Sequence, residues 1–138
     1  MNNKEFEKSI ESATLKIIQD VIANMEKSCL LVEREGKKNC PVDQGPLRAS
    51  IQHNVNFSEN EIVGSVFSNL EYAPYVHQGT GIYAVNGDGR KTPWRVPEIK
   101  KGKYKGEGFW TVGQKPNPFL DKAKLDNRDK ILRILAGD

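Results

Sequence analysis

The first forty residues follow a helical pattern of apolar positions. From Phe6 to Val32, apolar or small residues recur every three or four positions, which is the spacing of one face of an amphipathic helix. No proline or glycine interrupts this pattern before Gly36 and Pro41. The pattern therefore predicts a helix from about Asn3 to about Lys38, roughly 50 Å long.

A helix of this length is much longer than the usual three turns and would extend beyond the core of a small domain. Its far end would need cover from elsewhere, and a neighbouring copy of the chain is the first candidate. The alternative is a helix that breaks near Ser28 into two packed pieces.

The middle of the chain changes from a helical to an alternating pattern. Pro41 ends the helix, residues 43–46 have the composition of a turn in which Gly45 is free to take a positive φ, and Pro46 can open a short helical turn that carries Leu47. The segment Ile51–Phe57 then alternates apolar and polar residues, as a half-buried strand does. Residues 58–60 form a turn, and residues 62–67 are the expected hairpin partner.

A loop from His77 to Glu107 follows a short helical segment at residues 70–77. Within it we predict strands at residues 82–85 and 94–96, because the Asn86–Gly89 segment between them has hairpin-turn chemistry. Residues 108–112 should form a further strand, and a last helix should open at residues 118–120. The prediction is an α+β fold: a small antiparallel sheet packed by a long N-terminal helix and a C-terminal helix, with a long protruding loop.

Length and composition narrow the class of protein. A chain of 138 residues is the size of one domain, residues 1–138. It has no apolar run of the ~20 residues that span a bilayer, and its N-terminus lacks an apolar signal core, so we expect it to begin in the cytoplasm. Cys29 and Cys40 lie about 16 Å apart along a helix, too far for a disulfide. We expect both thiols to be reduced, and we expect no metal or cofactor.

The positive charge gathers in the loop. Residues 77–107 hold seven basic residues against three acidic ones, and aromatic residues lie among them. This mixture is typical of a protein interface, and it also suits a single-stranded nucleic acid. The residues that we expect at an interface between subunits or with a partner are Tyr83, Arg90, Lys91, Trp94, Arg95, Lys100, Lys101, Lys103 and Tyr104.

The sequence offers no catalytic set. His53 lies on the apolar face of its predicted strand, where a core or sheet-edge histidine is expected. His77 and Thr80 share a glycine-rich turn, but a hydrolase would need a third group to orient the imidazole. We therefore expect no catalytic residues, and a hydrolase built around His77 and Thr80 remains the alternative.

Three motifs in order carry a resemblance to a known family. They are residues 41–51 (PVDQGPLRASI), residues 72–81 (YAPYVHQGTG) and residues 113–120 (GQKPNPFL). Together with the long N-terminal helix, the hairpin and the C-terminal helix, they resemble the gene-product-ten-like tail-component family of long-tailed bacteriophages, the neck and tail-completion proteins. The matching positions that we expect to form the fold are Pro41, Asp43, Gly45, Leu47, Arg48, Tyr72, Tyr75, Gly79, Thr80, Gly81, Pro116, Pro118 and Phe119.

The resemblance implies a structural virion protein with no enzyme activity. Its subunits would form a ring, sixfold in the family, at the head–tail junction or the head-proximal end of the tail. The implied partners are other copies of the chain, a head-completion or connector protein, and a tail tube or terminator protein. DNA would only pass through the ring, and no membrane is involved. The protein would be made in the cytoplasm of a bacterial host and reside in the virion. The alternatives are a tail terminator or collar protein of a phage-tail-like particle, and a nucleic-acid-binding module that uses the basic loop.

Overall fold

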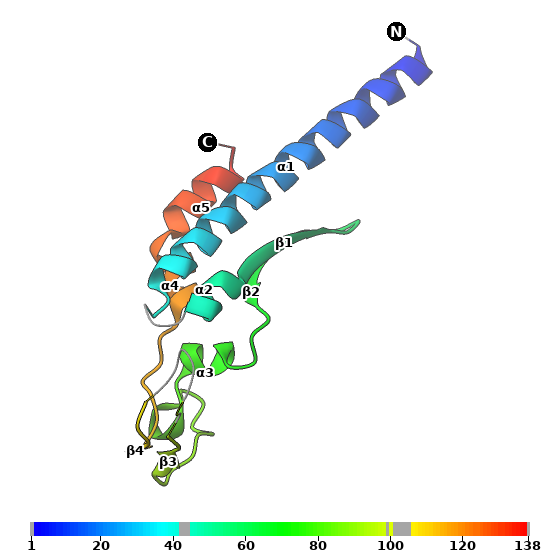
Figure 1. Cartoon of the computed structure of the whole chain (residues 1–138). Helices are drawn as coiled ribbons and strands as arrows, with labels where there is room; N and C mark the ends of the chain where they lie inside the picture. The colour runs from blue at the N-terminus through cyan, green and yellow to red at the C-terminus, as the bar shows by residue number, and fades with distance from the viewer. Residues whose placement is uncertain (1, 42–44, 99, 101–105, 138) are drawn as a thin grey trace.

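One long helix forms the axis of the molecule. A computed structural model describes residues 2–41, 45–98, 100 and 106–137, and in it α1 (Asn3–Asn39) is a single continuous helix (Figure 1). The side chain of Asn2 accepts a hydrogen bond from the backbone N–H of Glu5, in a capping box that starts the helix. The prediction of one long helix is confirmed, and the alternative of a break near Ser28 is wrong.

A hairpin and a short helix follow the end of α1. Cys40 is extended and Pro41 comes next, as expected for a helix stop. The helix α2 (Gly45–Ser50) leads directly into β1 (Ile51–Phe57), which pairs antiparallel with β2 (Ile62–Ser68). The predicted hairpin is confirmed. Of the predicted turn, Asp43 and Gln44 lie outside the described residues, and Gly45 and Pro46 are instead the first residues of α2.

The C-terminal segment forms two helices instead of one. The helices are α4 (Phe119–Asp126) and α5 (Arg128–Leu135). Between them Asn127 leaves the helical region, with φ −111° and ψ 15°, and its side-chain amide donates to the carbonyl of Ala123 at 2.8 Å. Both helices lie along the C-terminal half of α1, while the hairpin covers another side of it (Figure 1).

The core lies where α1, α2, the hairpin and α4 meet. Leu47 and Phe119 are almost completely buried there, together with Ile51 and Ala73. Gly36 of α1 faces Leu120 of α4. A Cβ added at residue 36 would lie only 2.8 Å from the Leu120 side chain. The missing side chain therefore lets α1 and α4 approach each other.

A second unit, which we call the lobe, consists of residues 79–98 and 106–116. It follows α3 (Ala73–Gln78) and holds the 3-10 turn η1 (Gly81–Tyr83) and two short strands. These are β3 (Trp94–Val96) and β4 (Phe109–Thr111), which pair antiparallel. The lobe lies at the opposite end of the molecule from the N-terminus (Figure 1).

The strand predicted at residues 82–85 is wrong. The backbone N–H of Ile82 donates to the carbonyl of Val112 at 3.0 Å. This segment therefore pairs with the chain near residue 112 and not with the strand at residues 94–96. The predicted strands at residues 94–96 and 108–112 are confirmed within one or two residues. The fold is α+β as predicted, with two separate two-stranded sheets in the described residues.

Candidate subunit interface

The N-terminal half of α1 is an apolar surface that the rest of the described chain leaves bare. Five large apolar residues are exposed there, and Ile17 keeps 63% of its surface open. The same stripe continues along α1 into Met25, Ser28 and Val32, which are half-buried or buried beneath β2 and the C-terminal helices. We call the bare half of the stripe the overhang; its exposed apolar residues are Phe6, Ile10, Ile17 and Val21, whereas Leu15 is exposed on the opposite face of α1.

The two motifs that enclose the loop pair directly with each other. The backbone N–H of Thr80 donates to the carbonyl of Gln114 at 3.0 Å, and the N–H of Gln114 donates back to the Thr80 hydroxyl oxygen at 2.9 Å. The N–H of Asn117 donates to the carbonyl of Val76 at 2.9 Å. These hydrogen bonds join the two ends of the loop, so the lobe has a fixed base on α3.

Gly81 makes this pairing possible. It has a φ of +61°, and a Cβ there would collide with the carbonyl of Val112. Pro116 also lies against Gly79, 3.0 Å from where a Cβ would stand. The described residues between the motifs therefore fold back as a compact unit.

Six of the nine predicted interface residues fall in the described part of the chain. Arg90, Lys91, Arg95 and Lys100 are exposed, Tyr83 is at the edge of exposure, and Trp94 is half-buried. Lys101, Lys103 and Tyr104 lie outside the described residues. The guanidinium of Arg90 stands 5.7 Å from the ring of Trp94, a distance typical of a cation–π contact.

The predicted set of interface residues leaves out two strongly exposed aromatic side chains of the lobe. Trp110 keeps 66% of its surface open, and Phe109 beside it keeps 56%. Their signal was a pair of large aromatic residues in a predicted strand. Successive side chains of a strand point to opposite faces, and both rings are exposed. Ile82 and Val85 are exposed in the same unit, so the lobe presents apolar as well as basic groups.

The residues expected to form the fold take different places in the structure. Leu47 and Phe119 are core residues, and Tyr72 packs against the core. Tyr75 is 62% exposed and lines a groove of about 570 Å³ between α3 and the lobe, so it is not a core residue. Asp43 lies outside the described residues, and Arg48 lies within α2 and lines a hollow beside α1. The remaining positions, which form turns, helix ends or close contacts, are Pro41, Gly45, Gly79, Thr80, Gly81, Pro116 and Pro118.

His53 pairs with two glutamates of α1. The sequence predicted only a core or sheet-edge histidine at this position. Its Nδ1 lies 2.9 Å from Glu33 and its Nε2 lies 3.0 Å from Glu26, both on α1. Burial lowers the pKa of His53, but the hydrogen bonds and charges of the two carboxylates outweigh it, so the pKa lies above its usual value. The imidazole therefore joins β1 to α1.

His77 and Thr80 each have a packing role. The Thr80 hydroxyl holds the backbone of Gln114, as described above. The His77 ring meets the Phe119 ring edge-on at 5.5 Å, and its Nε2 lies 3.8 Å from Asp121. No hydrogen bond joins His77 to Thr80 among the residues that the structure describes. These contacts hold α3 against α4 and the base of the lobe.

The two cysteines are free and buried, as predicted. Burial raises the pKa of both thiols, and the charges of Glu26 and Glu33 raise it further at Cys29, whereas Arg48 partly offsets it at Cys40. Protonated, buried thiols are poor nucleophiles and poor metal ligands.

Within the described ranges, no group of three metal-ligating side chains comes together. No helix in this part of the chain is both long and apolar enough to cross a membrane. Comparison of the chain with models of known protein families, with curated proteins and with solved structures finds no match. The phage-tail resemblance therefore rests on the three motifs and their order.

Proposed function

We propose that this chain is a structural subunit of a phage or prophage-derived tail. Its copies form a ring at the head–tail junction or at the head-proximal end of the tail, where they join or complete the tail. The order of the three motifs supports this assignment, and the fold agrees with the small α+β subunit that the resemblance implies.

The bare overhang of α1 is the observation that carries the proposal. Residues 3–22 extend about 30 Å, and their apolar stripe is exposed. Because they belong to the same continuous helix as the covered half, they cannot fold back onto their own core. Burying apolar surface is favourable, so this stripe favours a neighbouring protein.

A ring also needs a second surface of a different kind. In a ring, each subunit offers one surface to the neighbour ahead and another to the neighbour behind. The overhang lies at one end of the molecule and the lobe at the other (Figure 1). The exposed Phe109 and Trp110 give the lobe the aromatic anchors that interfaces favour.

The proposal includes the partners that the resemblance implies. A sixfold ring would contact a head-completion or connector protein on one side and a tail tube or terminator protein on the other, and DNA would pass through its centre. The chain would be made in the bacterial host cytoplasm and end in the virion. A terminator or collar of a phage-tail-like particle is a variant of the same proposal.

A nucleic-acid-binding module is the second candidate, supported by the exposed Arg90, Lys91, Arg95 and Lys100. The contact of Arg90 with Trp94 weighs against it, because that ring would otherwise be open for stacking on a base. Binding to DNA that weakens steeply with salt would favour this candidate.

Self-association tests the ring directly. The double variant Ile10→Lys/Ile17→Lys places two charges on the stripe, where both residues are exposed, so the subunit should fold normally. We expect analytical ultracentrifugation to show a closed oligomer for the wild type and monomers for this variant.

The matched control is Ser12→Lys/Gln19→Lys. It adds the same charge to the opposite face of α1, given the helical repeat of 3.6 residues. This control should assemble like the wild type. A wild-type chain that stays monomeric up to its solubility limit would contradict the ring.

A further inference from the structure

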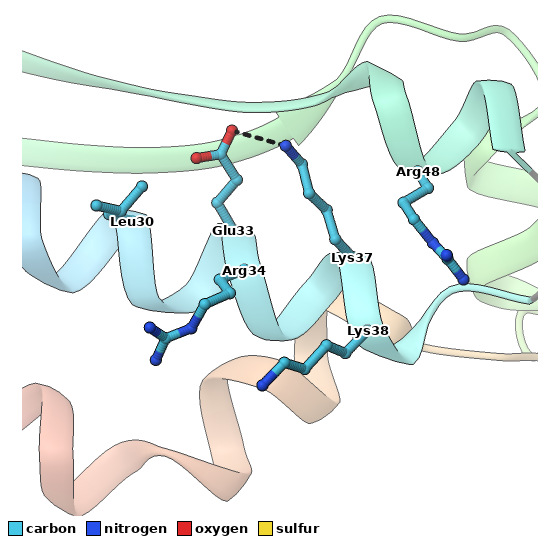
Figure 2. Close-up of a pocket in the computed structure, with 6 residues that line it drawn as sticks. All are labelled: Leu30, Glu33, Arg34, Lys37, Lys38 and Arg48. Carbon is cyan, nitrogen blue, oxygen red and sulfur yellow. Dashed lines mark ion pairs between the residues drawn. The ribbon is translucent and has the colours of Figure 1, made fainter.

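A basic hollow lies on α1 near its C-terminal end. It has a volume of about 610 Å³, and Figure 2 shows Arg48 reaching toward it from α2 while the other side chains come from the last turns of α1. Its lining residues are Leu30, Glu33, Arg34, Lys37, Lys38 and Arg48. Four cations and one carboxylate therefore face one space.

The single carboxylate of the hollow is already engaged. Glu33 lies 2.9 Å from Nδ1 of His53 and 3.7 Å from Nζ of Lys37. Its negative charge is thus shared between the ammonium group of Lys37 and the imidazole of His53, which is cationic when protonated. Among the lining residues that the structure describes, cationic side chains therefore outnumber carboxylates.

The other cationic side chains of the hollow can exchange their present ion-pair partner for another. Arg34 and Lys38 pair with Glu35 at 3.6 and 3.2 Å, but their side chains are 63% and 64% exposed, and exposed ion pairs contribute little. The Nε of Arg48 is buried and has no hydrogen-bond partner among the described residues. The two exposed side chains, Arg34 and Lys38, suit an incoming carboxylate.

The tip of the β1–β2 hairpin carries the complementary charge. No lysine or arginine occurs from Ala49 to Gly89, and the tip holds Glu59 and Glu61. Both are exposed, and so is Phe57 at the end of β1. Leu30, 57% exposed at the edge of the hollow, offers an apolar partner for Phe57.

The hairpin tip of the same copy cannot fill the hollow. β1 begins directly after α2 and runs for seven residues, about 20 Å. Figure 1 shows the tip reaching away from α2, along the direction of α1 toward its N-terminus. Any hairpin tip in the hollow must come from another molecule.

We propose that the hairpin tip of one copy of this chain docks into the basic hollow of the next copy. Glu59 and Glu61 meet Arg34, Lys38 and Arg48, and Phe57 packs on Leu30. The contact joins two different surfaces, so repetition of it closes a ring or extends a filament. This inference rests on the proposed ring and names one of its contacts.

Charge reversal tests the contact. Glu59→Lys/Glu61→Lys makes the tip basic, and Arg34→Glu/Lys38→Glu makes the hollow acidic. All four side chains are exposed, so both variants should keep the wild-type circular dichroism spectrum. Each variant alone places like charges opposite each other, and we expect its self-association to weaken about tenfold or more.

Mixing the two variants is the decisive step. In an equal mixture each basic tip finds an acidic hollow, and each acidic tip finds a basic one, so alternating rings should form again. Native mass spectrometry should then show assemblies with equal numbers of the two chains. The control Asp126→Lys/Asp129→Lys makes the same charge change on exposed residues of α4 and α5 and should leave assembly unchanged.

Three results would overturn the inference. If the charge-reversed variants assemble as tightly as the wild type, the proposed docking contact is ruled out and the proposed ring is not. If the wild-type chain does not assemble, both the proposed ring and the proposed contact are ruled out. Loss of DNA binding, with normal self-association, in the Arg34→Glu/Lys38→Glu variant would assign the hollow to nucleic acid.

Discussion

At the residue scale, His53 links the hairpin to the long helix. Its two ring nitrogens reach Glu33 and Glu26, seven residues apart on α1. Glu33 also lines the basic hollow and pairs with Lys37. One histidine therefore fixes the position of β1 and also pairs with Glu33, the one carboxylate among the described lining residues of the hollow.

This histidine should make stability depend on pH. Its pKa is raised in the folded state, so its ion pairs stabilise the fold fully below the unfolded pKa of about 6.5. Their contribution is lost as the pH rises through the higher folded pKa. The melting temperature of the wild type should exceed that of His53→Gln by about 3 °C at pH 6.

The difference between the two proteins should shrink as the pH is raised from 6 to 9 and the imidazole loses its proton. Glu11→Gln, an exposed change on the same helix, is the control and should follow the wild type at both pH values. A constant difference between wild type and His53→Gln from pH 6 to pH 9 would contradict the role of the charge.

Individual core residues were predictable where a motif and an apolar pattern agreed. Leu47 follows a proline at the start of a helical turn, and Phe119 opens a helix, and both are buried. Tyr75 belongs to the same kind of motif but faces a groove. Its exposure depends on how α3 sits beside the lobe, which a local pattern does not contain.

At the scale of elements, the lobe is held by backbone contacts between distant segments. Residues 80–82 exchange hydrogen bonds with residues 112–114. The approach requires glycine at position 81, where φ is positive and Val112 fills the space of a Cβ. A single methyl group added at residue 81 should therefore disturb the base of the lobe.

Gly81→Ala should disrupt the lobe. A positive φ costs a non-glycine residue about 1–2 kcal/mol, and the collision with Val112 should bring the total to about 3 kcal/mol or more. Amide hydrogen exchange should become faster at Ile82 and Gln114, whose N–H groups form these hydrogen bonds.

Gly87→Ala is the matched control for this prediction. Gly87 also has a positive φ, +70°, but a Cβ there meets nothing within 4 Å. Its cost should be only the conformational part, about 1 kcal/mol. Equal destabilisation by the two changes would show that the contact with Val112 is unimportant.

Elements with a long periodic pattern were predictable and short ones were not. The helical period fixed α1 to within a residue at each end, and alternation located both strands of the first hairpin. The strands of the lobe have three residues each and pair across twelve intervening positions. Such pairing is decided by long-range contacts, so the sequence suggested the wrong partner for β3.

At the scale of the whole molecule, the shape suits a subunit that works only in an assembly. The overhang extends from one end, and the lobe closes the other (Figure 1). The hairpin tip and the basic hollow add a second complementary pair of surfaces. The sequence predicted the overlong helix and the need to cover it, but the hollow arises only when α2 folds beside α1.

Deletion of this gene from the genome that encodes it tests the central claim most directly. Electron microscopy of the particles released after induction should show DNA-filled heads and separate or incomplete tails. The wild-type gene on a plasmid should restore complete particles, whereas Ile10→Lys/Ile17→Lys should not. Complete, infectious particles at normal yield in the absence of the chain would contradict its role as a tail-joining or tail-completing subunit.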